Sequence, residues 1–189
     1  QAIVLYEQAL QVRTRQTMPV QWASTTMNLA IAYRNRILGE WAENLDRAIE
    51  LYEQALQVRT RQAMPVEWAQ TTMNLANAYK NRIRGERAEN LEQAIALYEQ
   101  ALAVYTLLAF PDHHRRVQNS LGNLYCQQGD WSVATTAFEA ALKAGGVLYE
   151  TAATPEARQS ELSKLQGIPA RYTYALLKTN ALESTLCQQ

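Results

Sequence analysis

Residues 48–93 read AIELYEQALQVRTRQAMPVEWAQTTMNLANAYKNRIRGERAENLEQ, and nearly the same text stands directly before them. Residues 2–47 are identical to this stretch at 36 of 46 positions. A third copy begins with AIALYEQAL, and the spacing of 46 is repeated by Pro19, Pro65 and Pro111. Such a period predicts a supersecondary unit that cannot bury its own apolar face and therefore stacks on its neighbours.

Each unit contains two helical patterns. In the middle copy, apolar and small residues between Trp68 and Tyr79 fall three and four positions apart, which is typical of one face of a helix. Pro65 precedes this helix, where a missing backbone N–H costs nothing, and Gly85 follows it. We expect Asn90 to cap the second helix. No useful stretch alternates apolar with polar residues, so the predicted fold class is all-α.

The composition argues against several classes of protein. Eighteen Lys and Arg balance eighteen Asp and Glu, so no net charge draws the chain to nucleic acid or to an anionic membrane. Apolar runs fall far short of the roughly 18 residues of a membrane-spanning helix. The two cysteines, Cys126 and Cys187, are too few for a disulfide scaffold and favour a reducing compartment. We therefore expect a cytoplasmic protein.

The pattern within the helices, Leu-(Gly/Ala)-x-x-Tyr followed by Ala-x-x-x-(Tyr/Phe)-x-x-Ala, resembles the tetratricopeptide repeat. The third unit carries it at the family's standard spacing, in Leu121, Gly122, Tyr125, Gly129, Ala134, Phe138 and Ala141. The first two units depart from the family in having longer loops and in placing Trp22 and Trp68 seven residues before the Leu. The resemblance implies a right-handed superhelical solenoid of antiparallel pairs, in which the first helix (helix A) lines the concave side and the second (helix B) does not.

The 46-residue variety of the repeat is similar to bacterial arrays that precede a caspase-like peptidase domain of the CHAT type. The repeat array is expected over residues 1–145, starting within a repeat, and additional helices with a degenerate last repeat over residues 146–189. Both ends look cut, so we expect a fragment of a longer protein. Thr154 is the expected N-cap of one tail helix, and the pair Gly145-Gly146 is expected to end the helix before it.

Catalysis and metal binding are not expected. His114 and Cys126 lie twelve residues apart on one predicted helix, which places them about 18 Å from each other at 1.5 Å per residue. His113 and His114 are adjacent, so on a helix their side chains diverge, and no third ligand has the spacing of a zinc site. No glycine-rich phosphate loop is present, and no cofactor is expected.

The candidate binding site is the remaining face of the A helices, which holds seven of the ten asparagines. Asparagine is a poor helix former, but its amide can bind the backbone of an extended peptide, a role that the resemblance also implies. The predicted peptide-binding residues are Asn28, Arg34, Asn35, Gln70, Met73, Asn74, Asn77, Lys80, Asn81, Arg116, Asn119 and Asn123. Alternatively, these asparagines bond to neighbouring A helices or cap helix ends.

The predicted function is therefore a non-catalytic scaffold that binds a peptide or partner domain in the concave groove, as the regulatory arm of a longer peptidase protein. This face lacks acids and carries basic residues, which favours an acidic partner segment. The alternative is a self-assembly module, a homo-oligomer that stacks through the open ends of the solenoid. Neither nucleic acid nor membrane is expected as a partner.

Overall fold

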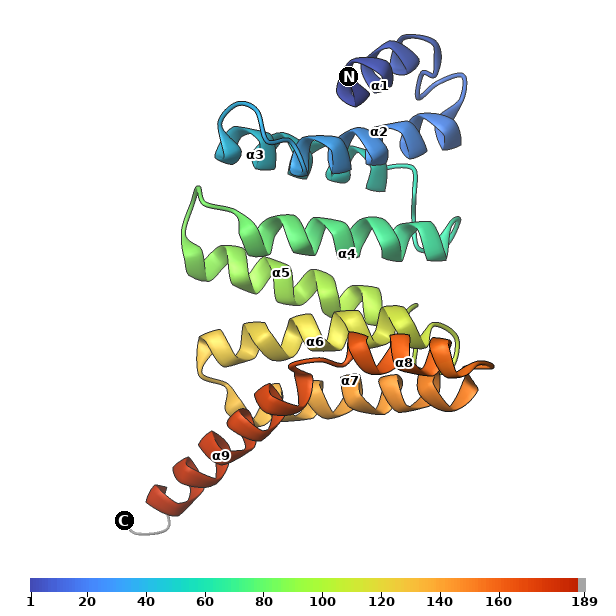
Figure 1. The fold of residues 1–189 in the computed structure, drawn as a ribbon. Helices are drawn as coiled ribbons and strands as arrows, with labels where there is room; N and C mark the ends of the chain where they lie inside the picture. Colours follow the sequence, from blue (N-terminus) through green and yellow to red (C-terminus); the bar gives the residue numbers. More distant parts are fainter. Residues whose placement is uncertain (187–189) are drawn as a thin grey trace. The chain divides into compact units, whose positions relative to one another are not determined.

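The structure, a computed structural model, describes residues 1–186, with side chains to residue 182 (Figure 1). Cys187 lies outside the described residues. The described part consists of nine α-helices without a strand, which confirms the all-α prediction. In chain order these are α1 (Ala2–Val12), α2 (Pro19–Arg34), α3 (Trp41–Leu56), α4 (Pro65–Asn81), α5 (Arg87–Leu102), α6 (Pro111–Gln128), α7 (Trp131–Thr151), α8 (Pro155–Lys164) and α9 (Ile168–Leu186).

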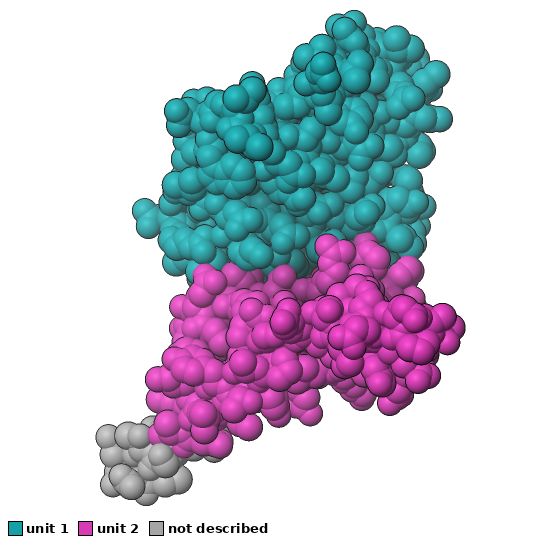
Figure 2. Space-filling model, in the orientation of Figure 1, with its two compact units in different colours: residues 1–104 teal, residues 105–189 magenta. Residues whose placement is uncertain are grey.

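The helices form two compact units, residues 1–104 with α1 to α5 and residues 105–189 with α6 to α9 (Figure 2). In the first unit α2 packs on α3 and α4 on α5, while α1 contacts α2 and α3 contacts α4. In the second unit α7 packs on α6 and also contacts α8 and α9. The expected division between an array over residues 1–145 and a tail over residues 146–189 stays a prediction, and residue 145 falls inside α7.

The helix boundaries follow the sequence repeat. The helices α2, α4 and α6 each begin at a proline in the first helical position, as predicted. The connection between the two helices of a pair spans residues 35–40 in the first pair and residues 82–86 in the second. In the third pair it shrinks to residues 129–130. The shorter third loop, expected from the spacing of the family pattern, is thus confirmed.

Buried asparagines hold the two long loops. Asn44 and Asn90 are each 4% exposed, and their amide nitrogens donate to the backbone oxygens of Leu38 and Arg84 at 2.9 Å. The prediction that Asn90 caps the second helix is wrong, because α5 begins at Arg87 and Asn90 lies in its first turn. Asparagine suits both positions because its amide N–H groups supply a donor to a loop carbonyl that would otherwise have none.

The two helices of a pair approach each other through small residues. Ala76 on α4 and Ala94 on α5 are both fully buried. In the third pair, a Cβ atom added at Gly122 on α6 would lie 2.6 Å from the ring of Phe138 on α7. This distance is far shorter than van der Waals contact, so the α6–α7 crossing has no room for a side chain at position 122.

A second close approach lies where the sequence suggested a helix end. The prediction that Gly145-Gly146 ends the preceding helix is wrong, because α7 continues through both glycines to Thr151. A Cβ at Gly145 would collide with the side chain of Leu165, which follows α8, so this glycine makes room for packing. The prediction for Thr154 is confirmed, since its hydroxyl accepts a hydrogen bond from the backbone N–H of Ala157 at 3.2 Å.

Two helical glycines allow a test of the crossing. Alanine is the better helix former by about 1 kcal/mol, so Gly146→Ala, with no atom near the added methyl, should stabilise the protein by about 0.5–1 kcal/mol. Gly122→Ala gains the same propensity but collides with a buried ring, and should destabilise by about 1–3 kcal/mol. Urea unfolding of both variants measures the difference, and equal effects would contradict the close α6–α7 approach.

Candidate functional site

The A helices of the first unit place the predicted binding residues on α2 and α4. We call this surface the helix A face of the first unit: Asn28, Arg34, Asn35, Gln70, Asn74, Asn77, Lys80 and Asn81. Four of these are exposed and four are partly buried; the exposed ones are Asn28, Asn35, Gln70 and Asn81. Met73 was predicted with them, but it is only 5% exposed, so its side chain belongs to the core and offers little surface to a ligand.

Two cations meet on this face. The Arg34 guanidinium on α2 donates to the Asn74 side-chain oxygen on α4 at 3.3 Å, which links the two A helices. Burial lowers the pKa of Lys80, and the nearby charge of Arg34 lowers it further. Among the described residues, neither Arg34 nor Lys80 forms an ion pair with a carboxylate. The face therefore carries two partly buried positive charges without a negative partner.

Asn77 is already occupied within the unit. Its side-chain oxygen accepts from the Tyr98 hydroxyl on α5 at 2.8 Å, and its amide nitrogen donates to the Met73 backbone oxygen at 2.9 Å. These bonds agree in part with the alternative that the asparagines serve the protein itself, although the partner of Asn77 is a B helix. Asn35 is the C-cap residue of α2, as that alternative also allows.

The first pair lacks the bond that Asn77 makes in the second. Tyr52 is the counterpart of Tyr98, and Ile31 stands where the second copy has Asn77. The Tyr52 hydroxyl is fully buried and has no hydrogen-bond partner among the described residues. Burial raises the pKa of Tyr52 to about 12. The third pair has Phe138 at this position, and phenylalanine has no hydroxyl that would need a partner.

This difference predicts opposite effects of the same substitution in two copies. Tyr52→Phe removes a buried hydroxyl that has no partner and should be neutral or stabilising by up to about 1 kcal/mol. Tyr98→Phe removes the donor to Asn77 and should destabilise by about 1 kcal/mol. Urea unfolding of the two variants compares them directly, and a larger loss in Tyr52→Phe would contradict the structure.

The raised pKa of Tyr52 also predicts a loss of stability in alkali. Between pH 10 and pH 12 the tyrosine of the unfolded chain releases its proton, whereas the folded protein keeps it. The unfolded state then binds fewer protons, so the free energy of unfolding falls as the pH rises. The contribution of Tyr52 is complete below pH 10 and disappears toward pH 12. In Tyr52→Phe the alkaline decline should be shallower, and an unchanged slope would contradict the burial of this hydroxyl.

The second unit contributes α6. Arg116 is exposed, and Asn119 and Asn123 are partly buried. The Asn123 amide nitrogen donates to the Asn119 backbone oxygen at 2.7 Å, and the Asn119 side-chain oxygen accepts from Arg171 on α9 at 3.3 Å. Phe138 stands opposite Asn123 in the repeat pattern. Because phenylalanine has no hydroxyl, it cannot donate to Asn123 as Tyr98 donates to Asn77.

The histidines and cysteine of α6 have structural surroundings. The His113 ring stacks on Tyr105 with 4.4 Å between ring centroids, and burial followed by the charge of Arg116 lowers the pKa of His113. His114 Nδ1 lies 2.9 Å from the Tyr105 backbone oxygen. Burial raises the pKa of Cys126, which disfavours a reactive thiolate. In the described part of the chain, no three acidic, His or Cys side chains are placed to bind a metal ion.

Sequence reasoning missed a buried arginine. Arg59 is 5% exposed and donates to the hydroxyls of Thr71 on α4 and Ser24 on α2, both at 3.0 Å. Arg13, its counterpart in the first copy, donates to Thr25 in the same way. The signal was present, because the motif QVRTRQ recurs before each of the first two A helices. Each arginine ties the loop before an A helix to that helix, and Arg59 also bonds to the preceding A helix.

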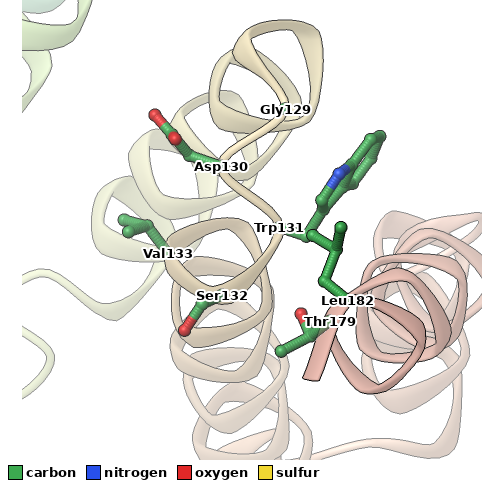
Figure 3. A pocket seen from close by; sticks show the side chains of 7 residues that line it. All are labelled: Gly129, Asp130, Trp131, Ser132, Val133, Thr179 and Leu182. Carbon is green, nitrogen blue, oxygen red and sulfur yellow. The ribbon is translucent and has the colours of Figure 1, made fainter. Parts of the chain in front are cut away.

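A shallow apolar pocket of about 290 Å³ was also not predicted (Figure 3). It lies in the second unit, between the start of α7 and α9. Figure 3 shows the Trp131 and Leu182 side chains close together, with Thr179 nearby on α9 and Asp130 on the other side of the chain.

No helix within residues 1–186 is both long and apolar enough to cross a membrane.

Known proteins share this architecture. Residues 69–144 match the tetratricopeptide repeat family. No curated protein matches the chain. Among solved structures, BtubC (BKLC) from P. vanneervenii is 23% identical, with a TM-score of 0.64 over 98% of this chain and 72% of that one.

Two further structures are similar in the same way. The nearly identical TPR-like repeats of a Podosopora anserina protein assigned as a kinesin light chain are 18% identical, with a TM-score of 0.59 over 99% of this chain and 88% of that one. MamA is 17% identical, with a TM-score of 0.54 over 96% of this chain and 89% of that one. Structural similarity at these low sequence identities shows a shared fold and does not show a shared function. The family match and the structural likenesses together support a tetratricopeptide-repeat array.

Proposed function

We propose that the array is a non-catalytic scaffold that binds an extended, acidic segment of a partner protein on the helix A face of the first unit. The observation that carries this proposal is the pair of partly buried cations, Arg34 and Lys80, which have no carboxylate partner among the described residues. A buried charge without a partner is costly, so such a pair is more typical of a binding surface than of a structural one.

The preference for a carboxylate follows from the state of Lys80. Burial and the charge of Arg34 lower its pKa, so the empty face destabilises the ammonium ion. A carboxylate placed between the two cations would reverse both effects, since an opposite charge favours the charged form of lysine. The gain would be realised only in the complex, which makes the interaction specific for an acidic ligand.

Asn74 supplies the backbone contact in this proposal. Its side-chain oxygen accepts from Arg34, and its amide nitrogen makes no hydrogen bond within the described residues. This N–H group can donate to a carbonyl of an extended peptide. Asn28, the counterpart on α2, is exposed and offers both its donor and its acceptor. Met73 and Asn77 are left out of the proposed site, because burial and the bonds to Tyr98 and Met73 occupy them.

The proposal is tested with peptides selected on the protein from a random display library. We expect the selected peptides to be enriched in Asp and Glu. Asn74→Ala should weaken their binding by about 1–3 kcal/mol, because a peptide carbonyl loses its donor. Lys80→Glu should weaken it further and reduce its dependence on salt, because a screened attraction has been removed. Isothermal titration at two salt concentrations measures both effects.

Gln100→Ala serves as the control, since Gln100 is exposed on the B helix α5, away from the helix A face. This variant should bind like the wild type. Selection of peptides without acidic enrichment, or full affinity in Asn74→Ala and Lys80→Glu with unchanged melting, would refute the proposed site. The partner would then contact the loops or the B helices.

The proposed setting is the cytoplasm of a bacterium, with the array as the regulatory arm of a CHAT-type peptidase protein. The similarity of the 46-residue repeat to such arrays supports this setting. Sequencing the complete coding region tests it, with a His and a Cys on an α/β pattern as the expected finding. Self-assembly is the alternative, and sedimentation of the purified chain over a range of concentrations distinguishes it.

A further inference from the structure

Four arginines gather at one edge of the first unit. They belong to the loops that follow α1 and α3, which lie at the same end of this unit, on the right in Figure 1. The Arg15 guanidinium donates to the side-chain oxygen of Gln57, and this bond joins the first loop to the end of α3. We call this surface the arginine edge: Arg13, Arg15, Arg59 and Arg61.

The arginine edge lacks matching acids. None of its four side chains forms an ion pair with a carboxylate among the described residues. In the loop between α4 and α5, by contrast, Arg82 and Arg84 both pair with Asp46 on α3. Residues 59–68 contain one carboxylate, Glu67, which forms no ion pair in the described part of the chain. The edge therefore carries positive charge that the first unit itself does not pair.

The packing of the repeat does not require the charge of Arg59. This arginine is 5% exposed, and it donates to two neutral groups, the hydroxyls of Thr71 and Ser24. Its Nε atom has no hydrogen-bond partner among the described residues. The third copy has Tyr105 and Val117 in the places of Arg59 and Thr71, and both are buried there. Since an uncharged pair can fill these positions, a buried cation is a costly choice for packing alone.

The exposed arginines are held against aromatic rings. The guanidinium carbon of Arg15 lies 5.8 Å from the ring centroid of Trp22, and that of Arg61 lies 5.9 Å from the ring centroid of Trp68. A guanidinium stacked in this way can still offer N–H groups at its rim to a carboxylate. Arg61 has α2 and α3 before it and α4 and α5 after it, and its side chain is exposed all the same.

We propose that the arginine edge is a second binding surface, which takes an acidic segment of a partner protein. Arg15 and Arg61 are the contacts, and the buried Arg59 is a fixed source of positive potential behind them. A buried charge is screened less by salt than an exposed one, so Arg59 strengthens the attraction without touching the ligand. The residues differ from those of the helix A face, so this proposal does not rest on the proposed function.

The aromatic residues decide between an acidic protein segment and a single-stranded nucleic acid. Proteins bind the bases of a single strand by stacking them on aromatic side chains. Here an arginine already lies over each indole ring, that of Trp22 and that of Trp68, and both tryptophans are partly buried. A carboxylate needs only the guanidinium groups, which makes the acidic protein segment the better fit.

The probe is a fluorescein-labelled peptide of alternating Glu and Gly, and its anisotropy is measured with Lys80→Glu as the starting protein. That change removes the attraction proposed for the helix A face, so the remaining binding reports on the arginine edge. Arg61→Glu, added to it, should weaken binding about five- to tenfold and reduce its dependence on salt. Arg47→Glu is the matched control, because it reverses the same charge on an exposed side chain of α3 and should change binding by less than about twofold.

A double variant tests the buried charge. Arg59→Tyr together with Thr71→Val reproduces the residues of the third copy, so its thermal melting by circular dichroism should stay close to that of the starting protein. Its affinity for the peptide should still fall about two- to threefold, because the potential behind the contacts is lost. Unchanged affinity in a folded double variant would overturn the role of Arg59.

The outcomes separate this proposal from the proposed function. Equal weakening by Arg61→Glu and Arg47→Glu, or no peptide binding by the Lys80→Glu protein, would overturn the arginine edge. Tighter binding of labelled oligothymidylate than of the peptide would overturn it too, since the surface would then favour nucleic acid. Peptide binding that Lys80→Glu leaves unchanged and Arg61→Glu removes would support the arginine edge and speak against the helix A face.

Discussion

The structure depends on how closely the two helices of a pair can approach each other. Where α6 meets α7, the approach is so close that only a hydrogen atom fits at position 122 beside the Phe138 ring. In the other pairs the corresponding residues are alanines with no exposed surface. An aromatic side chain then fills the space that the small residue leaves, and this arrangement sets the spacing of the whole pair. The loops, the caps and the polar bonds are arranged around it.

The polar residues of the A helices serve two different purposes. Some hold the unit together, as Asn77 does with Tyr98 and Arg59 does with Thr71 and Ser24. Others, such as Arg34 and Lys80, bring charge to a partly buried place without neutralising it. The first kind is satisfied in the folded chain, whereas the second has no carboxylate partner among the described residues. Polar residues that look alike in the sequence therefore have different surroundings in the fold.

The sequence alone predicts the helices and their pairing, because a repeat of 46 residues with helical spacing leaves few alternatives. It does not predict that α7 continues through Gly145 and Gly146, because the packing role of Gly145 depends on the side chain of Leu165, which lies on a later segment. Comparison of the copies does not reveal the role of Asn77, because Tyr52 stands opposite Ile31 in the first copy and Phe138 opposite Asn123 in the third. The burial of Met73 depends on the helices that pack around α4, so it could not be predicted from the spacing of residues along α4 alone.

The near identity of the first two copies has a consequence for how the chain reaches its fold. Since α3 and α5 present almost the same apolar face, α2 could pair with either of them in a chain that refolds from denaturant. During synthesis the N-terminal helices emerge first, so α2 meets α3 before α5 exists. A contact between neighbouring pairs distinguishes the copies: Arg84, after α4, pairs with Asp46 and Glu43 on α3, whereas the first copy has Leu38 at this position. During synthesis α2 therefore pairs with α3 first, whereas in a refolding chain it can also pair with α5. We expect refolding from denaturant to be slower and less uniform than folding during synthesis.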